Sequence, residues 1–251
     1  MRAVVCVRPV PVQSQVVFSM GVVDGTEAER QLGAAEAAAV ALARGLGAEV
    51  TVVSWTGPEG EAALRQALAL GASRAVRLHR PDPLSAEPWL DPDPGRAARV
   101  LAGYLREHPV EVILCGAASD DQGRAAVGPM LAELLGLPLA TGVVNARREG
   151  ESLVVECDRG PWRVTLRLGV PALLTVSEDA PRPARPSVMA LAKAMRVPVE
   201  VVQVEAPPTL LTAHALVSAE RRRPLRETLE ASDPEEACHL LLARLRERRV
   251  L

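Results

Sequence analysis

The stretch of sequence that decides the fold covers residues 112–144 and reads VILCGAASDDQGRAAVGPMLAELLGLPLATGVV. It starts with an apolar strand, continues through a small acidic loop that contains glycine, and then forms a helix and a second short strand. The first N–H groups of a helix have no partner within the helix, so a strand–loop–helix unit of this kind can hold an anion. In doubly wound folds that anion is typically a phosphate.

The segments before residue 112 repeat the same alternation of buried strand and helix. Strands are expected at residues 3–7, 49–55, 74–78 and 110–115, and helices over residues 28–45, 58–70 and 95–107. This alternation predicts an α/β fold with a doubly wound, mostly parallel, Rossmann-like sheet. Ligands of such sheets bind beyond the carboxyl ends of the strands, so the loops after Val7, Ser54 and Cys115 form one candidate site.

The pattern changes after residue 141. Three strands, at residues 152–157, 162–168 and 172–176, follow one another without long helices and predict a smaller antiparallel β region. A loop rich in Pro and Arg (178–186), a helix (188–195) and a strand (199–204) complete it. We therefore divide one domain into a nucleotide-binding α/β region, residues 1–141, and the antiparallel region, residues 142–205.

Residues 206–251 form a C-terminal helical extension. Pro207-Pro208 interrupts regular structure, Arg221–Arg223 is a charge run, and residues 234–249 have the spacing of an amphipathic helix. Asp233 is expected to cap that helix. A helix on such a tether either folds back on its own domain or docks on another chain, and the spacing leaves both open.

The composition is that of an ordinary globular protein, with 48% hydrophobic residues and a formal net charge of −2. It has no basic excess of the kind that nucleic-acid binding requires. Three Trp, one Tyr and one Phe imply a core built from Ala, Val and Leu. No signal peptide and no apolar run of about 20 residues are found, so a cytoplasmic protein without direct membrane insertion is expected.

No arrangement of catalytic or metal-binding residues stands out. The four Cys are far apart, the four His lie in unrelated contexts, and no Gly-x-Ser-x-Gly motif occurs. Cys6 and Cys115 are expected to be buried structural thiols. Asp120 and Asp121 are adjacent, which suits capping of the following helix better than acid–base catalysis. We therefore expect a binding or carrier protein rather than an enzyme, with no metal.

The loop after Cys115 has two interpretations. Gly116 permits a tight turn, and Gly128-Pro129 marks the start of the regular helix, because Pro is favoured at first helical positions. Residues 116–127 could then form a phosphate cradle, although the Gly-Lys-Ser/Thr triplet of a P-loop is absent. In the alternative, Asp121 merely caps a kinked helix and nothing binds.

Several segments occur in an order that is specific to one family. They are AVVCVR (3–8), EVTVVS (49–54) with LRQALALGA (64–72), the loop and helix from Gly116 to Thr141, and PALLT (171–175) with Pro181-Arg182. Over most of residues 1–205 this order resembles the beta subunit of electron transfer flavoprotein. The fold that the resemblance implies is related to the adenine-nucleotide hydrolases.

The resemblance also implies a role. Beta subunits of this family pair with an alpha subunit that carries most of the FAD site. The heterodimer passes electrons from acyl-CoA and similar dehydrogenases to a quinone reductase. Many beta subunits also hold one AMP, and bifurcating relatives hold a second FAD in its place. In such a carrier the flavin supplies the redox chemistry, and no protein side chain need act as an acid or base.

Site residues follow from the same resemblance. Those expected around an adenine nucleotide are Cys6, Trp55, Gly116, Ala117, Ser119, Asp121, Gly123, Arg124 and Val127. Those expected in partner recognition are Ser177, Glu178, Pro181 and Arg182. Arg30 stands where the family has an aromatic residue that approaches the flavin. Arg124 stands in the nucleotide loop, where its guanidinium is suited to a bidentate phosphate contact.

Two other functions remain open. The chain could be a stand-alone protein of related fold that binds or senses an adenine nucleotide, or an enzyme that processes a nucleotide. The C-terminal tether and helix favour the electron-carrier subunit, because a monomeric nucleotide binder has less need of them. We therefore expect residues 206–251 to dock on a partner.

Overall fold

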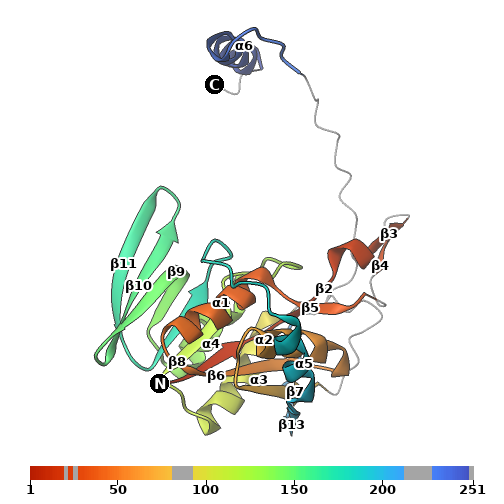
Figure 1. Ribbon diagram of the computed structural model, residues 1–251, viewed down its shortest axis with the longest axis vertical. Coiled ribbons are helices and arrows are strands. Elements are labelled where there is room, and N and C mark those ends of the chain that lie inside the picture. The colour runs from red at the N-terminus through yellow and green to blue at the C-terminus, as the bar shows by residue number, and fades with distance from the viewer. Residues whose placement is uncertain (20–21, 25–27, 81–92, 212–227, 249–251) are drawn as a thin grey trace. The chain divides into compact units, whose positions relative to one another are not determined.

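Figure 1 shows the computed structural model of the chain, which describes residues 1–19, 22–24, 28–80, 93–211 and 228–248. The chain divides into two compact units, residues 1–216 and residues 217–251, and each is described by itself. The first unit contains a sheet with its flanking helices, and the second contains α6 (Pro234–Glu247).

The first unit is built on a nine-stranded sheet with the order β11-β10-β9-β12-β8-β1-β6-β7-β13. Its strands are β1 (Arg2–Cys6), β6 (Glu49–Thr56), β7 (Arg74–His79), β8 (Val112–Gly116), β9 (Leu139–Glu149), β10 (Ser152–Arg159), β11 (Trp162–Gly169), β12 (Ala172–Val176) and β13 (Val199–Gln203). From β9 to β13 every neighbouring pair is parallel, whereas β9, β10 and β11 pair antiparallel. The predicted mostly parallel α/β fold is confirmed.

Helices cover both faces of this sheet (Figure 1). On one face lie α1 (Ala34–Gly45) and α2 (Glu61–Ala69), with α5 (Val188–Arg196) beside α2, and on the other lie α3 (Pro94–Glu107) and α4 (Val127–Leu135). Neighbouring residues of β1 divide between the faces, since Val5 belongs to the core under α1 and Val4 to the core under α3. Both cores consist largely of Ala, Val and Leu, as the few aromatic residues predicted.

The first long helix begins later than predicted. Residues 28–33 do not join α1, because β5 (Arg30–Leu32) pairs with β2 (Pro9–Pro11) in a two-stranded antiparallel ribbon. The first strand, β1, ends at Cys6, and Pro9–Pro11 is a separate strand. Proline cannot donate to a strand ladder, but Val10 between the two prolines keeps its N–H, and three paired positions suffice for a short ribbon.

The strand β12 is the second departure from the prediction. The expected antiparallel meander is confirmed for β10 and β11, but β12 pairs parallel with β8 on one side and with β9 on the other. All five of its residues are buried. A continuous apolar run without alternation is typical of a parallel strand covered on both faces, and Ala172–Val176 is such a run.

The remaining elements are short. A short antiparallel hairpin consists of β3 (Val17–Ser19) and β4 (Val22–Asp24). Two 3₁₀ turns, Gln13–Gln15 and Pro58–Gly60, precede β3 and α2. Residues 25–27, residues 81–92 and the charge run Arg221–Arg223 lie outside the described residues.

In the second unit, α6 begins where the sequence predicted. The Asp233 carboxylate accepts a hydrogen bond from the Glu236 N–H at 2.9 Å, which caps the helix. Within this unit α6 buries none of its own side chains. Among the described residues of the whole chain, no helix is both long enough and apolar enough to cross a membrane.

Candidate functional site

A cleft lies at the carboxyl ends of β1, β6 and β8, where the sequence predicted a site. Its walls are the ends of these strands, the loop after β8, and the first turns of α1, α3 and α4. Its cavity volume is about 130 Å³. Because parallel strands end at the same edge of the sheet, their loops meet there although they are far apart in sequence.

Most residues expected around a nucleotide line this cleft. The structure brings together Cys6, Trp55, Gly116, Ala117, Ser119, Arg124 and Val127. Two others lie outside the lining. Gly123 has a φ of +61° and allows the loop to turn, and Asp121 points toward Arg8. The helix after the loop begins at Val127, one residue before the predicted start.

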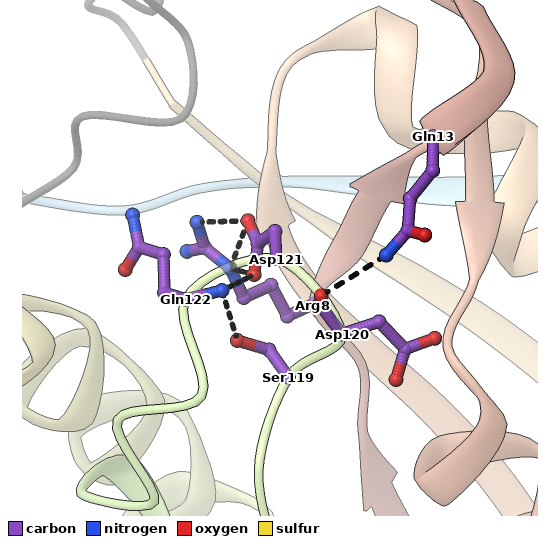
Figure 2. Close-up of polar contacts among 6 residues, drawn as sticks. All are labelled: Arg8, Gln13, Ser119, Asp120, Asp121 and Gln122. Atoms are coloured by element: carbon purple, nitrogen blue, oxygen red, sulfur yellow. Dashed lines mark hydrogen bonds and ion pairs between the residues drawn. The ribbon is translucent and has the colours of Figure 1, made fainter. Parts of the chain in front are cut away.

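Asp121 forms a bidentate ion pair with Arg8, the second residue after β1 (Figure 2). Arg8 Nη2 lies 2.8 Å from Asp121 Oδ2, and Arg8 Nε lies 3.1 Å from both carboxylate oxygens. Burial alone would raise the pKa of Asp121. The Arg8 guanidinium, the Ser119 hydroxyl and the Gln122 N–H outweigh that effect, so the pKa lies below its usual value. Asp121 therefore fixes the loop to β1.

Asp120 caps a helix, but not the one that follows it. Its Oδ2 accepts a hydrogen bond from the Ala34 N–H at 3.1 Å, in the first turn of α1. The start of α4 has no side-chain cap among the described residues. The expectation that Asp120 or Asp121 caps α4 is wrong, because both carboxylates are engaged by earlier parts of the chain. The first residues of α4, Val127 and Gly128, line the cleft, and no carboxylate among the described residues caps this helix.

The cleft is rich in guanidinium groups. Arg8, Arg30, Arg80 and Arg124 line it, against the two acids Glu36 and Asp93. Burial lowers the pKa of Arg30 below its usual value, while Glu59 and Asp121 act in the opposite direction. Asp93 caps α3 by accepting a hydrogen bond from the Arg96 N–H at 3.0 Å. This balance of charge favours an anionic ligand.

Trp55 forms the wall at the end of β6. Its ring lies under the Arg80 guanidinium at 4.6 Å and the Arg96 guanidinium at 5.2 Å, both within cation–π range. Its indole Nε1 is buried and has no hydrogen-bond partner among the described residues. A buried indole N–H usually donates a hydrogen bond, so an acceptor atom of a ligand would supply the missing partner.

Glu36, in the first turn of α1, was missed by the sequence analysis. It lines the cleft, and only 3% of the residue is exposed. Burial, with smaller contributions from Asp120 and Asp121, raises its pKa to about 7. The sequence does contain an indication that Glu36 is buried. The residues three and four positions further along, on the same helix face, are the apolar Ala39 and Val40, and both are fully buried.

Cys6 and Cys115 are neighbours in the register of β1 and β8. Both are buried, as expected, and both line the cleft. The Cys6 thiol and burial raise the pKa of the Cys115 thiol well above its usual value, and Glu36 adds to this shift. Since the thiolate is the reactive form of cysteine, Cys115 is an inert part of the wall at neutral pH.

The residues expected in partner recognition occupy two places. Ser177 and Glu178 line a second groove, together with Gln13, Asp120 and Gly123. Ser177 starts a turn in which its Oγ accepts a hydrogen bond from the Asp179 N–H at 3.2 Å. Pro181 and Arg182 are exposed in the loop that leads to α5, and neither lines that groove.

These features define a doubly wound α/β protein with an arginine-rich cleft at the carboxyl edge of its sheet. Residues 21–207 match the family model of the electron transfer flavoprotein domain, and the chain belongs to that family.

Curated relatives carry the same family name. The electron transfer flavoprotein subunit beta of Bacillus subtilis (strain 168) is 30% identical over 63% of this chain and 60% of its own length. The subunit of the same name from Homo sapiens is 31% identical over 62% of this chain and 59% of its own. The caffeyl-CoA reductase-Etf complex subunit CarD of Acetobacterium woodii is 27% identical over 67% of this chain and 62% of its own length. The chain thus spans about three-fifths of the length of these relatives.

Proposed function

We propose that this chain is the beta subunit of a two-chain electron transfer flavoprotein. In this role it pairs with an alpha subunit that holds most of an FAD site. The pair then carries electrons from a dehydrogenase of the acyl-CoA or a similar class to a quinone reductase. Family membership over residues 21–207 supports this role, as do relatives named electron transfer flavoprotein subunit beta.

The observation that carries the proposal is the cleft itself. It takes an adenine nucleotide, AMP or the adenine half of a second FAD. The start of α4 and the loop after β8 meet the phosphate, since helix N-termini attract anions. Arg124 contributes a charge-assisted hydrogen bond, and the unpartnered Trp55 Nε1 donates to a ligand acceptor.

The chain's own residues bind and orient, and the flavin of the complete protein supplies the redox chemistry. The Arg8–Asp121 pair holds the loop after β8 against β1, so the cradle exists before the ligand arrives. The Cys115 thiol stays protonated and supplies no nucleophile.

Exposed apolar side chains support pairing with other proteins. In α6, Leu240, Leu241 and Leu242 are exposed, and we assign this helix to the alpha-subunit contact. The turn at Ser177 and Glu178 and the loop at Pro181 and Arg182 are the proposed contact for redox partners.

Co-expression tests the proposal. The full chain would be produced together with an electron transfer flavoprotein alpha subunit from the same source, purified, and examined by absorption spectroscopy. Mass spectrometry of the released small molecules would identify the nucleotide. A yellow heterodimer that releases FAD and AMP, or FAD in excess of one per pair, supports it. A colourless monomer that hydrolyses AMP or ADP contradicts it.

A further inference from the structure

The Glu36 carboxyl group lies directly on the start of the loop that follows β8. A Cβ placed on Gly116 would come within 2.9 Å of Glu36 Cδ and 3.1 Å of Glu36 Oε2. Gly33, the residue before α1, is approached even more closely by the same carboxyl group. Two glycines therefore make room for an acid at the base of the proposed anion cradle.

The surroundings of Glu36 favour its neutral form. The pKa of Glu36 is raised to about 7, mainly by burial and to a smaller extent by the nearby acids Asp120 and Asp121. Only hydrogen bonds from the backbone N–H groups of Glu36 and Arg8 act in the other direction. The guanidinium of Arg8, which could have stabilised a carboxylate, is engaged by Asp121.

The carboxyl group also has unused hydrogen-bonding capacity. Glu36 Oε2 is buried and has no hydrogen-bond partner among the described residues, although Glu36 forms part of the cleft wall. A buried polar atom without a partner is costly and is usually completed by a ligand or water. A neutral carboxyl group has an O–H to donate, which a carboxylate lacks.

We propose that Glu36 binds the ligand of the cleft as a neutral acid, donating a hydrogen bond from its carboxyl group to the anionic group of that ligand. One proton is taken up from solvent when the anion binds. This rests on the proposed function, because it requires a phosphate in the cleft. A carboxylate at this wall would repel that phosphate, whereas a carboxylic acid held neutral by its surroundings is an effective donor.

The opposite arrangement predicts the opposite pH dependence. If an ionised Glu36 instead accepted a hydrogen bond from a ribose hydroxyl or a base amine, ligand binding would release a proton. Affinity would then rise with pH, since the ionised form would be the binding form. The sign of the pH dependence therefore separates the two.

Calorimetric titration of the full chain with AMP between pH 7 and pH 9 provides the test. The phosphate of a monoester has its second pKa near about 6, so AMP is almost fully ionised throughout this range. We expect the Kd of the unmodified chain to rise about tenfold between pH 8 and pH 9. Titration at pH 8 in two buffers of different ionisation enthalpy should show uptake of close to one proton per AMP.

Glu36→Gln is the informative variant, because an amide has the same shape, stays neutral and keeps an N–H donor. It should bind AMP with little change between pH 7 and pH 9 and should exceed the unmodified chain in affinity at pH 9. Glu133→Gln, on the exposed face of α4, is the matched control and should keep the pH profile of the unmodified chain. Thermal unfolding would confirm that both variants are folded.

Three results overturn the inference. Proton release on binding, or affinity that rises with pH, would assign Glu36 the acceptor role. Identical pH profiles in the unmodified chain and Glu36→Gln would show that Glu36 takes no part, while leaving the nucleotide site intact. Absence of AMP binding to any of these proteins at every pH would remove the proposed nucleotide site and the role of Glu36 together.

Discussion

Arg8 and Asp121 tie the end of the first strand to the loop that follows β8, through contacts of 2.8 and 3.1 Å between guanidinium and carboxylate. The Asp121 side chain is 7% exposed and that of Arg8 is 33% exposed. Paired carboxylate and guanidinium groups in this geometry make two parallel hydrogen bonds, which fix orientation as well as distance. The loop between Gly116 and Val127 is consequently positioned by β1, although it belongs to β8.

We predict that Asp121→Asn destabilises the fold by about 1–3 kcal/mol at pH 7, because the half-buried Arg8 guanidinium loses its charged hydrogen-bond acceptor. The folded-state pKa of Asp121 lies below the unfolded value of about 3.9. The stabilisation is therefore complete above pH 5 and is lost as the pH falls through the folded-state pKa. Urea unfolding at pH 7 and at pH 3 should show the variant converging on the unmodified chain in acid.

Asp158→Asn is the control for this prediction. The Asp158 side chain is 36% exposed and lies 3.7 Å from the guanidinium of Arg163, which is 58% exposed. Loss of this ion pair should therefore change stability by less than about 0.5 kcal/mol. An Asp121→Asn penalty that stays the same at pH 3 would show that the loss comes from packing rather than from the ion pair.

Gly128 allows α4 to approach β12 closely. A Cβ at this position would overlap the Thr175 side chain, which belongs to a fully buried strand. We predict that Gly128→Ala costs about 1–3 kcal/mol through overpacking. Gly103→Ala is the matched control, since a Cβ there meets nothing within 4 Å and Ala is the better helix former by about 1 kcal/mol. Chemical unfolding of both variants should give changes of opposite sign.

The repeating strand and helix pattern was sufficient to predict four of the parallel strands, β1, β6, β7 and β8, but not the parallel pairing of β12 and β13. Buried strands such as β1 and β8 read as continuous apolar runs, and helix ends were marked by Gly and Pro. The position of β12 was not predicted, because sequence neighbours usually pair and β11 precedes it directly. Only the lack of alternation in Ala172–Val176 indicated a strand buried on both faces.

Within the site, residue type and spacing identified which loops meet but not how their side chains pair. Asp120 and Asp121 were assigned to α4 because they precede it, yet their partners are Ala34 and Arg8, more than 80 residues earlier. Contacts of that range depend on strand order, which local patterns do not specify. Glu36 was not predicted as a site residue for the same reason, because its carboxyl group lies against Gly116, which belongs to β8 and is distant in the sequence.

Arg124 supplies a third prediction. Arg124→Ala should weaken AMP binding at least about tenfold, or about 1.4 kcal/mol, because a charge-assisted hydrogen bond to phosphate is lost. Thermal stability should change little, since Arg124 lies in an exposed part of the loop. Arg163→Ala, on the exposed strand β11, is the control and should leave AMP affinity unchanged. Equal affinities in all three proteins would argue against a phosphate contact by Arg124.

The apolar side chains of α6 give the last prediction. If they dock on an alpha subunit, the backbone amides of residues 235–247 should exchange rapidly with deuterium in the isolated chain and slowly once that subunit is added. Leu241→Ser removes the most exposed of three adjacent leucines and should weaken the complex at least about tenfold. Ala243→Ser, on the same helix, changes little apolar area and should leave the stability of the complex unchanged. Slow exchange in α6 before any partner is present would instead mean that this helix packs on its own chain.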